Sequence, residues 1–162
     1  MTEPTFEIIT FEEWRQNIVP LWPWNEDYRW IPIIHNPLGI MRYTGREIFE
    51  KVVQFPVVCK VDGEPAGYCC FYNISDTHIR TRGVYVDPKY RGRGLVKPML
   101  EYGCSLFADN WNTFILIARE DNIDYWLKTW FDRKCEGYDW LPRMVNGEEQ
   151  DIKITMLEKK FR

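Results

Sequence analysis

Apolar and polar positions alternate along the chain with two different periods, which predict strands and helices in turn. Alternating or continuous apolar runs predict strands at residues 6–9, 56–61, 66–74, 79–86, 113–118 and 151–157. Apolar positions at helical spacing predict four helices, which begin near residues 10, 44, 95 and 121. With a C-terminal hairpin, the order is β-α-α-β-β-β-α-β-α-β-β. This order predicts an α+β fold with a mixed, mostly antiparallel sheet.

Local signals indicate where several of these elements begin and end. Thr10-Phe11-Glu12-Glu13 and Thr44-Gly45-Arg46-Glu47 have capping-box spacing, so each is expected to start a helix. Pro20 is expected to stop the first helix. Asp62-Gly63 between two apolar runs predicts a tight β-hairpin. The stretch 21–41, rich in Trp, Pro and Ile, is expected to be an ordered aromatic loop region.

Length and composition fit a single domain over residues 1–162. The chain has 45% hydrophobic and 16% aromatic residues, which supply a sizeable core and exclude disorder. No apolar run approaches the roughly 20 residues that a membrane helix needs. The five cysteines are odd in number and contain no C-x-x-C pair, so neither a disulfide framework nor a metal site is expected. These features favour a reducing, cytoplasmic location.

Charge is unevenly distributed, although the net charge of −3 indicates no nucleic-acid or membrane surface for the whole molecule. Six cationic residues and one acidic residue lie between positions 78 and 97. Six acidic residues and two arginines lie between positions 1 and 30. Both stretches can be solvated faces; alternatively, an anion binds at the first and a cation near the second.

The segment 83–96, GVYVDPKYRGRGLV, joins a predicted strand to a predicted helix through glycines. Glycines at such a junction let successive backbone N–H groups point at one spot, and the first helical turn adds unpaired N–H groups and a partial positive charge. Together they form a site suited to phosphate. Pro98 fits the first turn of that helix, where its missing N–H costs little. Two alternatives remain: glycines that serve only a tight turn, and an arginine–glycine segment that binds RNA.

The stretch 84–95 resembles the central motif of GNAT acetyltransferases, Q/R-x-x-G-x-G/A. Arg91 and Gly94 match this motif, and Val96 stands where Gly or Ala is usual. The resemblance extends over residues 6–138 and implies a sheet of six or seven strands that is splayed between its fourth and fifth strands. It also implies which residues bind CoA. The pyrophosphate is expected on the loop (Arg91, Gly92, Arg93, Gly94, Leu95 and Val96). The pantetheine arm is expected to pair with main-chain groups of Val84 and Val86 on the preceding strand, and Asn122, which opens the fourth helix, is expected to contribute as well.

Attack of an amine on a thioester needs a base to accept a proton, and the leaving thiolate can take a proton from an acid. Many relatives carry the base as a carboxylate on the strand before the motif, where this chain has Arg80 and Thr81. His78 on that strand and Glu120 after the next strand are the candidate bases. Each can equally be a surface or helix-capping residue.

The acid of the family is a Tyr seven residues after the Asn of the fourth helix, and here that position is Thr129. Tyr125 and Tyr138 are candidate substitutes by proximity, although each can be an ordinary core or rim aromatic. No cysteine stands in an evident nucleophile setting, which favours direct transfer over a covalent acyl-enzyme.

The acceptor side is expected in the aromatic and acidic N-terminal region. Tryptophan and tyrosine faces interleaved with acids can hold an ammonium group. The candidates are Trp22, Trp24, Glu26, Tyr28 and Trp30. The alternative is that these tryptophans belong to the core and the acids are solvated.

The resemblance therefore implies a cytoplasmic N-acetyltransferase that uses acetyl-CoA as acyl donor, acts on a cationic primary amine in a ternary complex, and needs no metal. Neither nucleic acid nor membrane is an expected partner, and a homodimer is one possible assembly. The alternative is a CoA-binding module of the same fold without turnover, which the absence of the usual carboxylate and Tyr favours. A nucleic-acid binder that uses the basic stretch is a second alternative, marked by steep salt dependence.

Overall fold

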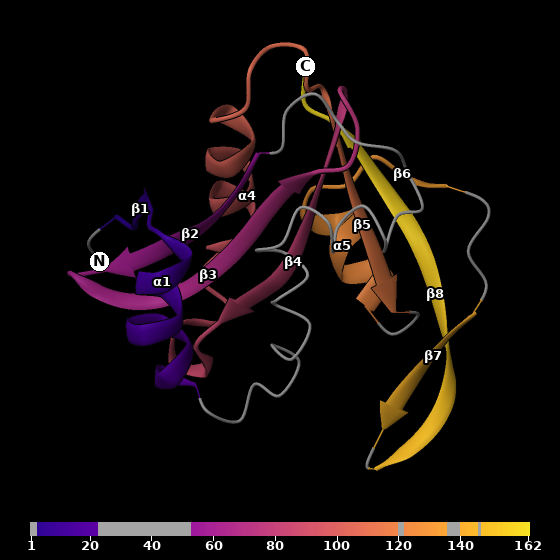
Figure 1. Cartoon of the computed structure of the whole chain (residues 1–162), viewed down its shortest axis with the longest axis horizontal. Helices are drawn as coiled ribbons and strands as arrows, with labels where there is room; N and C mark the ends of the chain where they lie inside the picture. The colour runs from indigo at the N-terminus through magenta and orange to yellow at the C-terminus, as the bar shows by residue number, and fades with distance from the viewer. Residues whose placement is uncertain (1–2, 23–52, 120–121, 136–139, 146) are drawn as a thin grey trace.

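The structure is a computed structural model that describes residues 3–22, 53–119, 122–135, 140–145 and 147–162 (Figure 1). Strands and helices alternate much as predicted, in the order β1 Thr5–Ile8, α1 Phe11–Glu13, η1 Trp14–Ile18, η2 Val19–Leu21, β2 Gln54–Val61, β3 Glu64–Asn73, β4 His78–Val86, η4 Pro88–Tyr90, α4 Val96–Ser105, β5 Thr113–Arg119, α5 Ile123–Thr129, β6 Arg133–Cys135, β7 Trp140–Val145 and β8 Glu148–Lys160. The helix predicted to begin at Thr44 lies outside the described residues.

The strands form one sheet in the order β1-β2-β3-β4-β5-β8-β6, with β7 paired to β8. Every neighbouring pair is antiparallel except β4 and β5, which run parallel. The parallel pair is joined through α4, as a strand–helix–strand unit requires. The α+β class and the mostly antiparallel sheet are therefore confirmed.

The N-terminal helical segment begins where the capping box predicts. The Thr10 hydroxyl accepts a hydrogen bond from the Glu13 N–H at 3.1 Å. The segment is α-helical only at first, continues as a π-helix and ends as the 3₁₀ turn Val19–Leu21. Pro20 was expected to stop this segment but lies inside it, because a proline fits the first turn of a new helix.

The hairpin between β2 and β3 is confirmed. Asp62 and Gly63 both have positive φ, 52° and 80°, and connect the paired residues Val61 and Glu64. Positive φ at both central residues gives the turn a twist that matches the strands it joins.

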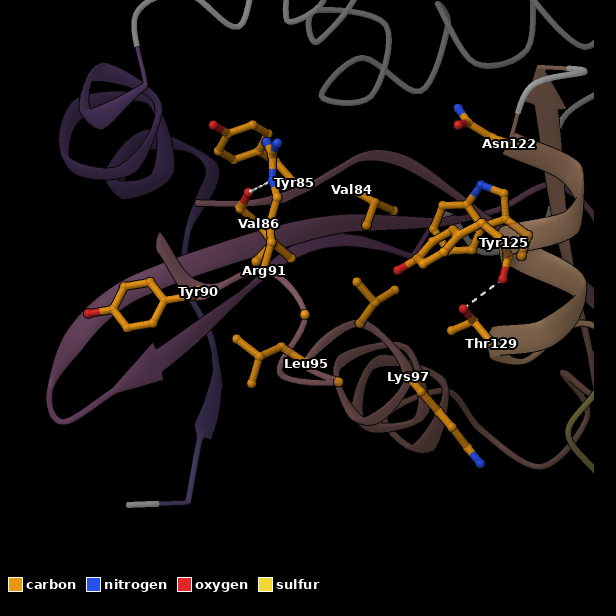
Figure 2. A pocket seen from close by; sticks show the side chains of 14 residues that line it. Val84, Tyr85, Val86, Tyr90, Arg91, Leu95, Lys97, Asn122, Tyr125 and Thr129 are labelled. Carbon is orange, nitrogen blue, oxygen red and sulfur yellow. Dashed lines mark hydrogen bonds between the residues drawn. The ribbon is translucent and has the colours of Figure 1, made fainter. Parts of the chain in front are cut away.

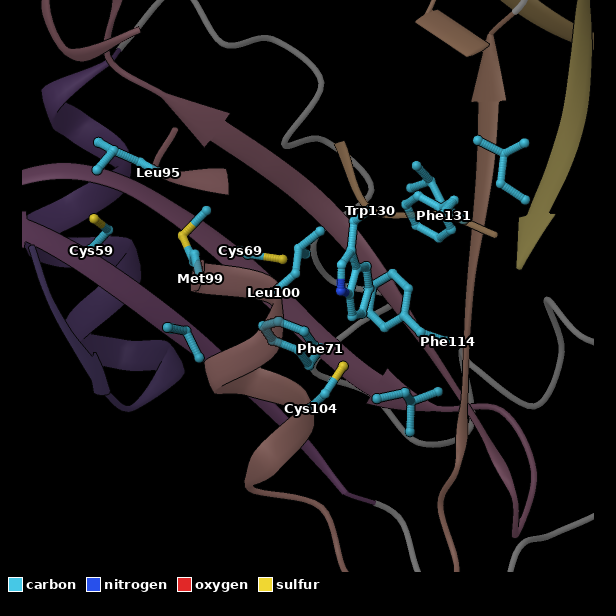
Figure 3. Close-up of a cluster of buried hydrophobic side chains, with 14 of the residues drawn as sticks. Cys59, Cys69, Phe71, Leu95, Met99, Leu100, Cys104, Phe114, Trp130 and Phe131 are labelled. Atoms are coloured by element: carbon cyan, nitrogen blue, oxygen red, sulfur yellow. The ribbon is translucent and has the colours of Figure 1, made fainter. Parts of the chain in front are cut away.

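Side chains alternate along β3 and divide the core into two clusters, one on each face of the sheet. Cys69 and Phe71 face the larger cluster, which α4 covers (Figure 3) and which Ile123 of α5 joins. Tyr68 and Cys70 face the smaller cluster, which is covered by the N-terminal helical segment.

The helix α4 approaches the sheet closely at Gly103, where a Cβ atom would overlap the ring of Phe71. Met99 and Leu100 are fully buried on the same helical face. Leu106 falls at the helical spacing of this face but is 40% exposed, because α4 ends at Ser105 and the chain turns away.

Candidate functional site

The sheet opens between β4 and β5. These strands pair only at His78–Thr113, Ile79–Phe114 and Arg80–Ile115. No pair joins them from Thr81 onward within the described residues. The predicted splay between the fourth and fifth strands is therefore present.

A β-bulge in β4 lies where the two strands part. Tyr68 pairs with Tyr85 and Cys70 pairs with Arg82, so two residues of β4 stand opposite the single residue Cys69. One of them, Gly83, has a φ of 71°, which a glycine adopts without strain. A bulge bends its strand and increases the local twist. The bulge therefore turns the second half of β4 away from β5.

The opening continues into a cleft of about 720 Å³ (Figure 2). Three structural elements line it: the end of β4, the loop that leads into α4, and one face of α5. The lining residues are Val84, Tyr85, Val86, Tyr90, Arg91, Gly92, Gly94, Leu95, Val96, Lys97, Asn122, Tyr125, Trp126 and Thr129.

The glycine loop is shaped to leave its backbone accessible. Gly92 and Gly94 have φ values of 79° and 70°, and a Cβ atom at either position would meet open space. Leu95 is buried and anchors the end of the loop in the core. The helix α4 then starts at Val96, so Pro98 falls in its first turn, as predicted. Open backbone, a helix N-terminus and nearby cations together suit a diphosphate.

The main chain of β4 faces the cleft at the predicted positions. The Asp87 N–H donates to the Ala66 carbonyl on β3 at 2.8 Å. Because main-chain groups alternate between the two edges of a strand, those of Val86 face the opening instead. The Val86 carbonyl accepts a hydrogen bond from Nε of Arg91 at 2.8 Å (Figure 2). The Arg91 side chain is therefore folded back onto β4, where it occupies one main-chain hydrogen-bond acceptor.

The helix α5 contributes a polar and aromatic wall. Asn122 opens the helix and is exposed, and its side chain makes no capping hydrogen bond. Tyr125 is 50% exposed, and Figure 2 shows its ring reaching from α5 into the cleft. The Thr129 hydroxyl donates to the Tyr125 carbonyl at 2.7 Å.

The cleft brings together most of the residues predicted to bind CoA, together with Tyr125. Arg93 is the exception, since it does not line the cleft and its guanidinium lies 5.1 Å from the centre of the Tyr90 ring. Glu120, Tyr138 and the acceptor candidates Trp24, Glu26, Tyr28 and Trp30 lie outside the described residues.

His78 does not line the cleft. It starts β4 at the end that is paired with β5, opposite Thr113. Val84 lies six positions further along the strand, which corresponds to about 20 Å in an extended chain. Its ring Nδ1 lies 2.7 Å from the Thr77 hydroxyl oxygen. The structure does not place this candidate base beside the site.

Trp22 was predicted to offer an aromatic face to an ammonium group, but its side chain is only 4% exposed. Its ring packs against Tyr68 and Tyr85, with centroid distances of 5.9 and 5.0 Å. Its indole N–H donates to Oδ2 of Asp87 at 2.9 Å. In this structure Trp22 is a core residue.

Thr81 is one of the two residues at the position of the usual family carboxylate, and its hydroxyl is hydrogen-bonded to residues of β3. The Thr81 hydroxyl donates to the Cys70 carbonyl at 2.8 Å, and its oxygen lies 2.6 Å from Sγ of Cys69. Because the one hydroxyl proton is given to the carbonyl, the Cys69 thiol is the donor in the second contact. Burial raises the pKa of Cys69 to about 12, so this thiol stays protonated and offers no base.

Gly83 at the bulge and four cleft-lining residues were not among the residues predicted for the site (Tyr85, Tyr90, Lys97 and Trp126). Gly83 had a readable signal, because an isolated glycine inside a strand pattern often marks a bulge. Trp126 packs partly buried against the core and also lines the cleft. Among the described residues, no group of His, Cys, Asp or Glu is placed to hold a metal ion, and no helix is long and apolar enough to span a membrane.

The family model for the acetyltransferase (GNAT) family matches residues 8–129. This match covers more than half of the chain, so the chain belongs to that family of acyl-CoA-dependent N-acyltransferases. Comparison with curated proteins gave no match.

Solved structures share the fold. A GNAT family acetyltransferase from Elizabethkingia anophelis with acetyl-CoA bound is 12% identical, with a TM-score of 0.66 over 99% of this chain and 100% of that chain. A spermidine N-acetyltransferase variant from Vibrio cholerae is 13% identical, with a TM-score of 0.62 over 96% and 94% of the two chains. An IAA acetyltransferase from Bacillus cereus is 14% identical, with a TM-score of 0.61 over 98% and 100%.

Proposed function

We propose that the protein transfers an acetyl group from acetyl-CoA to a primary amine within a ternary complex. The observation that carries this proposal is the cleft between the splayed strands β4 and β5, which ends at a positive-φ glycine loop and a helix N-terminus. A long, thin ligand with an anionic end fits this arrangement. The pyrophosphate lies on the loop from Arg91 to Val96, and the pantetheine arm runs along β4.

Main-chain groups of Val84 and Val86 pair with the pantetheine arm as a neighbouring strand would. The Val86 carbonyl already accepts a hydrogen bond from Arg91. The arm therefore binds Val86 through its N–H, or Arg91 swings away when CoA enters. Asn122, exposed at the start of α5, supplies a further amide on the opposite wall.

In the transfer step the neutral amine attacks the thioester carbonyl carbon. A C–N bond forms and the C–S bond breaks, the attacking nitrogen gives up a proton to a base, and CoA leaves as a thiolate that takes up a proton. We assign the proton donor as the Tyr125 hydroxyl, because this residue lines the cleft and is half exposed. Glu120 remains the sequence-based candidate for the base, and the position of His78 argues against that residue.

The four cysteines whose side chains the structure describes support direct transfer. Cys59, Cys69, Cys70 and Cys104 are free and buried. Burial raises the pKa of Cys59 to about 11, and the pKa of the other three thiols is also raised, so none supplies a thiolate near neutral pH.

For the acceptor we propose a cationic primary amine, bound by the acidic and aromatic residues Trp24, Glu26, Tyr28 and Trp30. The acids that cluster in residues 1–30 support this proposal, because the basic stretch 78–97 already serves the anionic donor. One structural neighbour is by its name a spermidine N-acetyltransferase, and this name supports the choice of a cationic amine.

One observation favours the alternative of a CoA-binding module without turnover. Thr81 stands at the position of the usual family carboxylate, and Thr129 stands at the position of the usual Tyr. Both hydroxyls donate to main-chain carbonyls. A module of this kind would bind CoA through the same cleft without releasing its thiol.

Two measurements test the proposal. CoA at millimolar concentration should raise the melting temperature, because a ligand that binds only the folded state stabilises it. Free-thiol release from acetyl-CoA should then be followed with polyamines, aminoglycosides and lysine-bearing peptides as acceptors. Binding without thiol release across the panel would favour the module. Absence of a thermal shift with CoA would overturn both the acetyltransferase and the CoA-binding module. Preference for an anionic or neutral amine would overturn the proposed acceptor class.

A further inference from the structure

The N-terminal helical segment is tied to the start of the glycine loop by one carboxylate. Oδ2 of Asp87 accepts the indole N–H of Trp22 at 2.9 Å, and Oδ1 accepts the Lys89 N–H at 2.9 Å. Trp22 and Asp87 are 65 residues apart in sequence. Hydrogen bonds to a charged acceptor are stronger than those between neutral groups. Asp87 therefore holds two distant parts of the chain in one arrangement.

Asp87 stands at the junction where β4 becomes the loop. Its N–H donates to the Ala66 carbonyl at 2.8 Å, and its carbonyl accepts the Tyr90 N–H at 2.9 Å. The 3₁₀ turn Pro88–Tyr90 follows, and Arg91 comes directly after it. The orientation of the Asp87 side chain therefore affects the direction in which the chain enters the glycine loop.

The ring of Tyr85 links the same two elements a second time. Trp22 packs against it at a centroid distance of 5.0 Å, and the guanidinium of Arg91 lies 5.4 Å from its centre. Arg91 also donates to the Val86 carbonyl. Trp22 therefore contacts both residues, Tyr85 and Asp87, that hold the first part of the loop.

We propose that Trp22 is a positioning residue for CoA: its indole N–H, acting through Asp87, holds the glycine loop in the shape that receives the pyrophosphate. This inference rests on the proposed function, since it takes CoA as the ligand of the loop. Trp22 itself does not line the cleft and is not expected to touch the cofactor. Its effect is expected in CoA affinity rather than in the chemical step.

The test replaces Trp22 by Phe, which keeps an aromatic ring but removes the N–H. Trp14→Phe is the matched control, because Trp14 is buried in the same cluster and also contacts Tyr68, at a centroid distance of 5.4 Å. Both variants should lose thermal stability. Only Trp22→Phe should raise the Kd for CoA in calorimetric titration, by about five- to tenfold, the scale of the net contribution of one hydrogen bond. Equal CoA affinity in both variants would overturn the proposal.

A double-mutant cycle separates positioning from general destabilisation. Asp87→Ala leaves the Trp22 ring in place, and the double variant Trp22→Phe/Asp87→Ala completes the cycle. If Trp22 acts through Asp87, the two effects on the Kd are not additive, and the double variant resembles Asp87→Ala alone. Additive effects would overturn the proposal while CoA binding by the wild type still stands. If the wild-type protein binds no CoA, the proposed function fails and this inference fails with it.

Discussion

On α5 the Thr129 hydroxyl donates a hydrogen bond to the Tyr125 carbonyl, 2.7 Å away. Residues four apart in a helix share one face, and both line the cleft. Thr129 stands where the family resemblance expects the proton-donating Tyr, and its hydroxyl proton is already given to the helix backbone. Tyr125, one turn earlier on the same face, carries the phenol that the cleft would otherwise lack on this wall.

Replacing Tyr125 by Phe should therefore lower kcat for acetyl transfer. Loss of general acid catalysis is expected to cost about 10²-fold or more, because the thiolate leaves without a proton. The ring stays in place, so the Kd for CoA should hardly change. Stopped-flow or steady-state thiol release, beside calorimetric titration of CoA, measures the two effects separately.

Tyr102→Phe is the control for Tyr125→Phe. Tyr102 lies on α4, does not line the cleft and stacks on Phe6 at a centroid distance of 5.7 Å. It should leave kcat unchanged. If Tyr125→Phe retained wild-type turnover across the pH range, the proton donor would have to be sought elsewhere.

A second prediction concerns His78, which the sequence offered as a base. Because it sits at the paired end of β4, His78→Ala should leave kcat within about twofold of the wild type, well short of the loss that removal of a general base causes. The acidic limb of the pH–rate profile should be the same in both proteins. A fall of about 10²-fold in kcat, with the acidic limb abolished, would restore His78 as the base.

The sequence predicted the outline of the site because its main signals are local. The glycine loop, Pro98 in the first helical turn and the Asp62-Gly63 hairpin depend on conformations of a few adjacent residues. Gly92 and Gly94 indeed have positive φ, as a strand–glycine–helix junction requires. Such signals can be read without knowing which distant segments pack together.

The errors arose where two distant segments meet. Whether Trp22 is a surface or a core residue depends on Asp87 and Tyr85, and no spacing rule connects them. The same holds for His78, whose distance from the cleft depends on where β5 stops pairing with β4. A residue's place on a strand could be predicted, but not how far along the strand the pairing with β5 extends.

A third prediction concerns the buried thiols. In the folded protein at pH 8, iodoacetamide should label none of Cys59, Cys69, Cys70 and Cys104, because burial both blocks access and raises the pKa of each thiol. In denaturant all four should react. Peptide mapping by mass spectrometry distinguishes the sites, and rapid native labelling of Cys59, Cys69, Cys70 or Cys104 would contradict the structure.

The carboxylate of Asp87 should make stability depend on pH. The hydrogen bond from Trp22, followed by that from the Lys89 N–H, lowers the pKa of Asp87 in the folded state. An unfolded Asp has a pKa of about 3.9. The carboxylate therefore stabilises the fold above that value, and its contribution is lost as the pH falls through the lowered folded-state pKa.

Asp87→Asn should accordingly melt below the wild type at pH 7, and the gap should narrow as the pH falls below about 4. Asp76→Asn is the control. Asp76 is exposed in the turn between β3 and β4, so the melting temperature of this variant should match that of the wild type at each pH. Thermal melts followed by circular dichroism at a series of pH values make the comparison. A gap that stays constant down to pH 3 would show that the charge of Asp87 is not what stabilises the fold.

The last prediction tests the glycine loop itself. Gly94→Glu should raise the Kd for CoA by at least about 10²-fold, since it places a carboxylate where the pyrophosphate is bound and like charges repel at short range. A Cβ atom at this position meets no protein atoms within 4 Å, so the structural cost expected is the strain of a positive φ, 70°. Gly63→Glu carries the same charge change and a similar strain, at φ 80° in an exposed hairpin that does not line the cleft. Circular dichroism should show both variants folded, with comparable losses of melting temperature, and calorimetry should show CoA affinity lost in Gly94→Glu alone. Equal affinity in the two variants would mean that the donor binds somewhere other than this loop.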